Sequence, residues 1–250
     1  MDTVQRNDVE WGSLSIDRLV DKFERGEILL PEIQREYEWK SAQLVKLFDS
    51  LYRAYPVGTL LLWESHDVVE TRQAAFTPSV QSALTSYPQL LLDGQQRLTS
   101  LLRVMRGEVN LLFNLEHPEL NGRISESADG EAGEEDPIAD RATLLSRQTF
   151  QVASAVLRRS HSWVSVKRIF DGADFNFLTE LKQYANNDDT FNRWQQRIEA
   201  LKKIPAYMFQ FQTLPPSLSY EQVADIFVRV NSGGTRLGGT DLALAQVTSR

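Results

Sequence analysis

The chain contains no cysteine and only three histidines, His66, His117 and His161, among its 250 residues. The absence of cysteine excludes a disulfide scaffold and thiolate metal sites, and it agrees with a reducing, cytoplasmic location. Because the three histidines are widely spaced, a histidine-rich metal site is not expected.

Several sequence signatures of other protein classes are also absent. The chain has no run of about eighteen apolar residues and no signal-peptide core, so no membrane association is expected. It has no Gly-x-x-x-x-Gly-Lys-Ser/Thr segment, so any nucleotide hydrolysis would not use a P-loop. Gly-x-Ser-x-Gly and His-Glu-x-x-His are absent as well, which excludes the hydrolase and metalloprotease classes that carry them.

Charge is distributed unevenly along the chain. The net charge of −7 argues against nucleic-acid binding over the whole surface. Residues 116–140 hold nine acidic side chains and one basic one, whereas residues 141–170 hold six lysines or arginines and no acid. The basic segment is either a DNA-binding face or an ordinary solvated helix face. Its candidate DNA-binding residues are Arg158, Arg159, Lys167 and Arg168.

Apolar residues recur with the i, i+3, i+4, i+7 spacing of an amphipathic helix in four segments. Ser41 and Thr240 are expected N-caps, and Gly26 is expected just after the end of the first helix. The four predicted helices are centred on Ile16, Leu19, Val20 and Phe23; on Leu44, Leu47, Phe48 and Leu51; on Leu98, Leu101, Leu102 and Met105; and on Val223, Ile226, Phe227 and Val230.

Short apolar runs predict strands at residues 58–63, 89–92, 109–115 and 206–212. Helices that alternate with short strands indicate an α+β fold. The chain is predicted to end inside a helix that begins at Thr240, which favours a fragment of a longer protein. We divide it into a core at 1–115, an acidic loop or linker at 116–140, a mainly helical addition at 141–204, and a strand and helices at 205–250 that return to the core.

Aromatic and polar side chains are mixed at residues 30–39, directly before the second predicted helix. Amide, guanidinium and aromatic groups together suit stacking on a base and binding of a phosphate or a base edge. The alternative is a loop whose aromatic residues anchor it to the core while Arg35 pairs with an acid. The candidate binding residues here are Gln34, Arg35, Tyr37 and Trp39.

The sequence Asp93-Gly94-Gln95-Gln96-Arg97 stands where an apolar run meets a predicted helix. Free N–H groups at a helix start favour anions, and an arginine in the first turn strengthens this preference. Asp93 is expected to hold a divalent cation or a water, Gln95 or Gln96 to position that water, and Arg97 to neutralise phosphoryl charge. Alternatively, Asp93 is an N-cap and the polar side chains that follow it are solvated.

A third segment, residues 227–242, reads FVRVNSGGTRLGGTDL, so a helix ends in Asn-Ser-Gly-Gly and another begins soon after. Glycines allow a close backbone approach to a ligand, and the neighbouring side chains offer hydrogen bonds. The candidate residues are Asn231, Ser232 and Gly233. A plain connection between two helices has the same composition, so this segment alone carries little information.

Together the three segments resemble the N-terminal domain of GmrSD-type modification-dependent restriction proteins. The family pattern is Pro-x-x-Gln-Arg-x-Tyr-x-Trp, then Asp-Gly-Gln-Gln-Arg, then Phe-x-x-x-Asn-x-x-Gly-x-x-Leu. The order and the intervals agree over residues 14–244. The matching residues here are Pro31, Gln34, Arg35, Tyr37 and Trp39; Asp93 to Arg97; and Phe227, Asn231, Gly234 and Leu237.

The resemblance implies a ParB/sulfiredoxin-like α/β core that hydrolyses or senses a nucleoside triphosphate with a divalent metal, expected to be Mg²⁺, within anti-phage DNA restriction. It also implies a partner nuclease domain, C-terminal in cis or supplied in trans, and DNA, modified or unmodified, as a further partner. Asp93, Gln95, Gln96 and Arg97 would then form the catalytic centre, and Gly94 with the first and third segments would bind nucleotide.

Two alternatives remain open from the sequence. Instead of hydrolysing nucleotide, the chain could be a reader of modified DNA without turnover, in which the basic segment is the DNA face and Asp93 is structural, or it could be a DNA-nicking nuclease. One carboxylate with one arginine makes a poor two-metal phosphodiesterase, so the nuclease ranks last.

Overall fold

The computed structural model describes residues 9–30, 37–64, 88–118, 148–172 and 175–231. The chain forms two compact units. Unit 1 comprises residues 1–40, 54–102 and 204–250, and unit 2 comprises residues 41–53 and 103–203. Both contain helices and strands, so the predicted α+β class is confirmed. No helix in the described part of the chain is long and apolar enough to cross a membrane.

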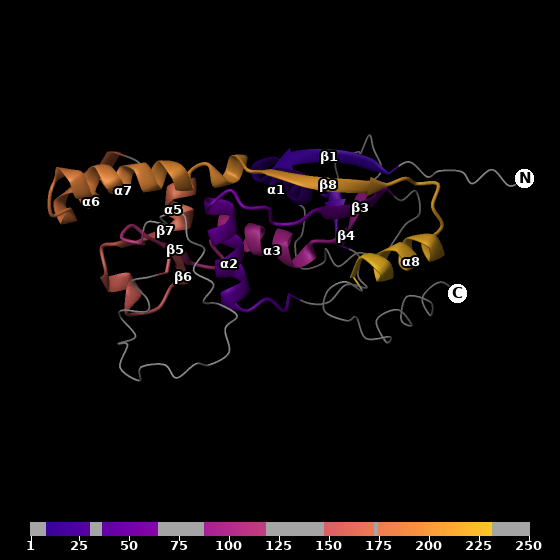
Figure 1. The fold of residues 1–250 in the computed structure, drawn as a ribbon, viewed down its shortest axis with the longest axis horizontal. Helices are drawn as coiled ribbons and strands as arrows, with labels where there is room; N and C mark the ends of the chain where they lie inside the picture. The colour runs from indigo at the N-terminus through magenta and orange to yellow at the C-terminus, as the bar shows by residue number, and fades with distance from the viewer. Residues whose placement is uncertain (1–8, 31–36, 65–87, 119–147, 173–174, 232–250) are drawn as a thin grey trace, which may run out of the picture. The chain divides into compact units, whose positions relative to one another are not determined.

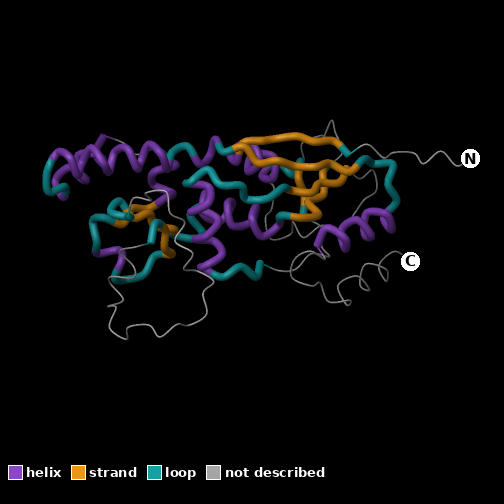
Figure 2. The backbone as a smooth tube through the Cα atoms, in the orientation of Figure 1, coloured by secondary structure: helices purple, strands orange, loops and turns teal. Residues whose placement is uncertain are grey.

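Unit 1 is built on a five-stranded sheet with the order β1-β8-β3-β4-β2. β1 and β8 pair antiparallel, β8 and β3 parallel, β3 and β4 antiparallel, and β4 and β2 parallel. Figures 1 and 2 show β1 and β8 running side by side along most of their length. The strands span Glu10–Ser15 (β1), Ile28–Leu29 (β2), Leu60–Glu64 (β3), Gln89–Asp93 (β4) and Met208–Leu214 (β8).

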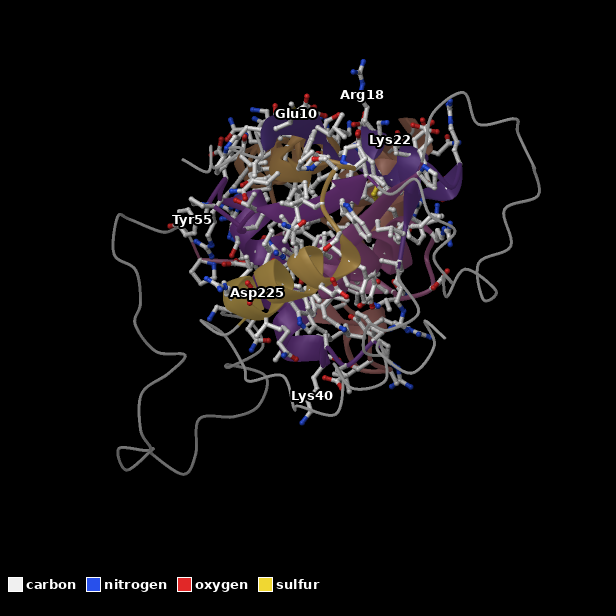
Figure 3. All side chains as sticks on the ribbon, turned by 90° about the vertical axis from the view of Figure 1, so that its right-hand side faces the viewer. Glu10, Arg18, Lys22, Lys40, Tyr55 and Asp225 are labelled. Atoms are coloured by element: carbon white, nitrogen blue, oxygen red, sulfur yellow. The ribbon has the colours of Figure 1, made fainter. Side chains whose placement is uncertain are left out.

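Helix α8 (Tyr220–Asn231) covers part of one face of this sheet. Its Val223, Ile226 and Phe227 pack on apolar side chains from the three central strands. Asp225 points outward from α8 and pairs with Arg229, which leaves the inner side of the helix apolar (Figure 3). The sheet residues in this cluster are Leu61, Trp63, Leu90, Leu92 and Leu214.

Two further helices belong wholly or partly to unit 1. α1 (Ile16–Glu24) buries Ile16, Leu19, Val20 and Phe23 and turns Arg18 toward solvent (Figure 3). It ends as predicted, because Gly26 has φ +74° and its N–H donates to the carbonyl of Phe23. α3 (Gln95–Met105) begins in unit 1, and its last turn belongs to unit 2.

Unit 2 contains a three-stranded antiparallel sheet with the order β6-β5-β7. Its core joins Phe48 and Tyr52 of α2 to Phe113 of β5 and Phe150 of β6, with ring centroids 5.1–6.1 Å apart. The elements of unit 2 are α2 (Ser41–Tyr52), β5 (Leu111–Asn114), β6 (Phe150–Val152), η2 (Leu157–Arg159), β7 (Trp163–Ser165), α5 (Val166–Phe170), α6 (Phe175–Tyr184) and α7 (Asp188–Leu201). The short helix η3 (Ile204–Ala206) follows α7 and belongs to unit 1.

The structure corrects one expectation about local structure, because Ser41 is the first residue of α2 and not its N-cap. The segment that was predicted to be mainly helical contains α5, α6 and α7 and also the short strands β6 and β7, which pair on either side of β5. α2 and β5 group with unit 2, together with the strands that β5 pairs. Thr240 and residues 119–140 lie outside the described residues.

Candidate functional site

The Asp93-Gly94-Gln95 segment is the turn that joins β4 to α3, as the sequence predicted. A register shift in the pairing of β3 with β4 sets Asp93 opposite Leu61 and Leu91 opposite Leu62, which makes Leu92 an extra residue. Such bulges redirect the neighbouring side chain. Asp93 is the last residue of the strand, and its carboxylate is 33% exposed. It is therefore accessible at the start of a helix.

Arg97 is anchored to the protein by three hydrogen bonds. Its Nη1 donates to the carbonyl of Val57 at 2.8 Å, and its Nη2 donates to the carbonyl of Thr59 at 2.9 Å. Nη2 also donates to Oδ2 of Asp93 at 2.9 Å. Burial, the largest effect, lowers the pKa of Arg97 from its ordinary value, and Asp93 opposes this shift. Arg97 thus ties the 57–59 turn to the end of β4.

Two glycines leave room for this guanidinium. Gly58 has φ +86° and Gly94 has φ +98°, a conformation that side-chain-bearing residues rarely adopt. A Cβ atom on Gly58 would overlap Nη1 of Arg97. A Cβ atom on Gly94 would overlap the side chain of Leu60 and lie 3.3 Å from Nη2 of Arg97. Both turns are therefore shaped by contact with one arginine.

Gln96 connects this turn to the aromatic segment before α2. Its Oε1 accepts hydrogen bonds from the backbone N–H groups of Glu38, at 3.0 Å, and Trp39, at 3.3 Å. Because an amide side chain that caps two backbone donors is fixed in direction, Gln96 holds residues 38 and 39 beside the start of α3. The first two sequence segments are thus brought together in unit 1.

A second link joins the same two segments through Ser100, one turn further along α3. Ser100 Oγ donates to the carbonyl of Gln96 at 2.7 Å and lies 3.1 Å from the hydroxyl of Tyr37. Since the single Ser100 hydroxyl proton is used toward Gln96, Tyr37 is the donor to Ser100. Ser100 is fully buried, and sequence reasoning did not identify it.

The remaining predicted residues are placed less completely. Gln34, Arg35, Ser232 and Gly233 lie outside the described residues, as does the side chain of Asn231, the last residue of α8. Gln95 is the first residue of α3 and is partly exposed. Of the third segment, Phe227 packs on the apolar cluster that contains Leu90 and Leu92 of β4, the strand that ends at Asp93.

The arrangement offers little to a metal ion on its own. Among the described residues, no three histidine, aspartate or glutamate side chains gather as ligands. Oδ2 of Asp93 already accepts from Arg97, so Oδ1 is the oxygen that remains for a cation. A Mg²⁺ ion here would take most of its ligands from phosphate oxygens and water, which is common for this ion.

The four predicted DNA-binding residues differ in their surroundings within unit 2. Lys167 pairs with Asp171 at 2.6 Å, and Arg168 lies 3.3 Å from Glu180 and over the ring of Phe177. Arg158 and Arg159 are exposed on η2 and make no ion pair with residues that the structure describes.

Comparison with known proteins gives two findings. The model of the GmrSD restriction endonuclease N-terminal domain matches residues 16–248. An uncharacterized protein of Methanocaldococcus jannaschii is 28% identical over 255 residues, covering 91% of this chain. The match spans 40% of that relative's length.

Proposed function

Because the chain belongs to the family of GmrSD restriction endonuclease N-terminal domains, we propose that it hydrolyses or senses a nucleoside triphosphate for a modification-dependent, anti-phage DNA restriction protein. The DNA substrate and a nuclease domain, in cis or in trans, are part of this proposal. The likeness to a ParB-type core is carried over with it from the sequence pattern.

The observation that carries the proposal is the position of Asp93. Its partly exposed carboxylate ends β4 directly before α3, and Gln96 holds the segment with Tyr37 and Trp39 beside the same helix turn. A carboxylate next to a helix start and an aromatic segment provides a base for water and a surface for a nucleobase.

The residues take different roles in this proposal. Asp93 is the base for the attacking water, and Gln95 positions that water. The nucleotide contacts the aromatic segment through Tyr37 and Trp39 and the neighbouring Gln34 and Arg35. Gly94 permits a close approach of phosphate. Asn231, Ser232 and Gly233 stay in the proposal as further nucleotide-binding residues, on the sequence pattern alone.

Arg97 and Gln96 act as positioning residues. Three N–H donors of Arg97 are committed to Val57, Thr59 and Asp93, so these contacts favour holding Asp93 over binding phosphate. We propose that Mg²⁺ enters as the counterion of the nucleotide, with Oδ1 of Asp93 as its one carboxylate ligand.

The test measures phosphate release from ATP, GTP, CTP and UTP with Mg²⁺ for the wild type and for Asp93→Asn. An asparagine oxygen still accepts from Arg97, so the substitution removes the negative charge at position 93 and leaves the hydrogen bonds of Arg97 in place. We expect hydrolysis to fall by about 100-fold or more, the usual size of a general-base contribution.

Asp49→Asn is the matched control. Asp49 pairs with Arg53 four residues later at 2.5 Å and is 31% exposed, much like Asp93 with Arg97, but it lies in unit 2. The Asp49→Asn variant is expected to release phosphate at the wild-type rate. Equal activity of Asp93→Asn and the wild type would overturn the role of Asp93.

A second candidate is a reader of modified DNA without turnover. It is favoured by the hydrogen bonding of Arg97, whose donors would otherwise serve a phosphoryl group. Salt-dependent DNA binding without phosphate release from any of the four nucleotides, even with DNA present, would support the reader over the hydrolase.

A further inference from the structure

We propose that unit 2 contacts a DNA strand through the turn at residues 156–161 and the aromatic pair His161–Tyr184, and that Lys167 and Arg168 take no part. The choice of DNA as partner rests on the proposed role in restriction. The choice of surface rests on charge and contacts within unit 2.

The local charge suits a polyanion. Residues 148–170 carry four cationic side chains and no carboxylate, in a chain whose net charge is −7. In a chain of net negative charge, a segment with cations and no acid is the more favourable place for a phosphate backbone.

The turn presents two arginines on a fixed backbone. Leu157 is buried and anchors η2, and the N–H groups of Arg158 and Arg159 donate to the carbonyls of Ser154 and Val156. The two guanidinium groups are exposed and form no ion pair with the described part of the chain. Binding phosphate would therefore break no ion pair of these side chains with the described residues.

Lys167 and Arg168 are already neutralised. Lys167 donates to both carboxylate oxygens of Asp171, at 2.6 and 2.7 Å. Arg168 contacts Glu180 and lies 4.4 Å from the centroid of the Phe177 ring. A phosphate would compete with these carboxylates, so equal charge in the sequence does not mean equal availability in the fold.

An aromatic surface stands next to the arginines. The rings of His161 and Tyr184 stack with centroids 3.5 Å apart and planes 7° apart, and Tyr184 is 41% exposed. The backbone beside His161 is fixed, since the carbonyl of Ser162 accepts from the N–H of Leu115 at 2.7 Å. Exposed aromatic rings beside cations bind nucleic acid by stacking on a base, with little dependence on sequence.

The experiment measures the affinity of a fluorescent DNA oligonucleotide, single-stranded and duplex, at several salt concentrations. It compares Arg158→Ala/Arg159→Ala with Lys167→Ala/Arg168→Ala, which change the net charge equally. We expect the first pair to weaken binding at least about 10-fold and to lower the salt slope by roughly 1.4–1.8, the value for two lost phosphate contacts. The second pair is expected to leave the slope unchanged.

Tyr184 separates stacking from charge. Tyr184→Ala is expected to weaken binding of the single strand without changing the salt slope, whereas Tyr184→Phe retains the wild-type affinity. Thermal melting of each variant identifies any that fail to fold. Tyr184→Phe, as the conservative variant, and Lys167→Ala/Arg168→Ala, as the charge control, show whether a loss of binding goes beyond a loss of folding.

Equal losses in the two charge pairs would overturn the proposal, because they would indicate a general electrostatic effect. Absence of DNA binding by the wild-type protein would overturn it as well. Neither result bears on phosphate release, which is measured separately without DNA, so failure of this surface and failure of the proposed hydrolysis are distinguishable.

Discussion

Gly58 and Arg97 fit together only because residue 58 has no side chain: a Cβ atom there would overlap Nη1 of the arginine. The same nitrogen donates to the carbonyl of Val57, the residue just before the glycine. The turn and the guanidinium thus enclose one another, and Arg97 also holds Asp93. The position of the candidate catalytic carboxylate therefore depends on a turn that is distant in sequence.

Gly58→Ala is expected to destabilise unit 1 by about 2–4 kcal/mol, because positive φ costs roughly 1–2 kcal/mol and overlap with Arg97 adds to it. Gly26→Ala is the control. Gly26 also has positive φ, but a Cβ there would be 4.0 Å from its nearest neighbour, Leu29. Urea denaturation of both variants checks this, and equal destabilisation would contradict the role of the Arg97 contact.

Arg97→Lys is expected to lower stability by about 1–3 kcal/mol although it keeps the charge. An ammonium group cannot make the forked contacts with Val57, Thr59 and Asp93 that a planar guanidinium makes. Arg25→Lys, at an exposed pair with Asp21, should change the melting temperature very little. A similar shift of the melting temperature in the two variants would argue against a stabilising role of the Arg97 hydrogen bonds with Val57, Thr59 and Asp93.

Gln96→Leu is expected to increase hydrogen exchange of the amides of Glu38 and Trp39, whose N–H groups lose their acceptor. Gln96→Glu retains an acceptor oxygen and should keep the protection. Mass spectrometry of a peptide covering these residues provides the measurement. Unchanged exchange in Gln96→Leu would mean that other contacts hold this segment.

His117 is expected to make stability fall in mildly acidic solution. Its Nδ1 donates to the carbonyl of Pro118 at 3.1 Å, which leaves Nε2 to accept from the hydroxyl of Tyr52 at 3.3 Å. Burial lowers the pKa of His117 from its ordinary value, the carbonyl of Pro118 opposes this, and nearby Arg197 and Arg53 lower it further, with Asp49 acting against them.

The unfolded chain therefore takes up the His117 proton at a higher pH than the folded chain. The stability linked to the neutral ring is present above about pH 6.5 and is lost as the pH falls toward the folded-state pKa. Melting temperatures from pH 7.5 to 5 should decline less in His117→Gln than in the wild type. The exposed His161, changed to Gln, provides the control, and parallel pH profiles of wild type and His117→Gln would refute the assignment.

Four helices could be predicted one by one, because each places apolar residues on one side, whereas the longest helix, α7, was predicted only as part of a mainly helical segment. α1, α3 and α8 each contain the predicted quartet, and β4 covers the strand predicted at 89–92 and extends one residue further, to Asp93. Strands of two or three residues, such as β2 and β6, are too short to show alternation. β1 has few apolar residues and a glycine, so its pairing with β8 was not evident.

The candidate site divides in a similar way. The motif located the turn at Asp93 and Gly94, because a carboxylate and a glycine between strand and helix are a local signal. The contacts of Arg97 with Val57 and Thr59 are to backbone carbonyls 40 and 38 residues away, which no side-chain pattern records. The glycine at position 58, just before an apolar strand, was the one local sign of that turn.

The place of β8 in the sheet has a consequence for synthesis on the ribosome. Among the described residues β8 is the last strand of unit 1 along the chain, yet it lies between β1 and β3. While residues 103–203 emerge, β3 and β4 can already pair, but β8, the strand with which β1 pairs in the described structure, is not yet made. The nascent chain must therefore keep its first strand unpaired until most of the polypeptide has been translated. A translational stop before Met208 would leave β1 without β8 as its partner and would expose the edge of β3 that β8 covers. Exposed strand edges associate with other chains.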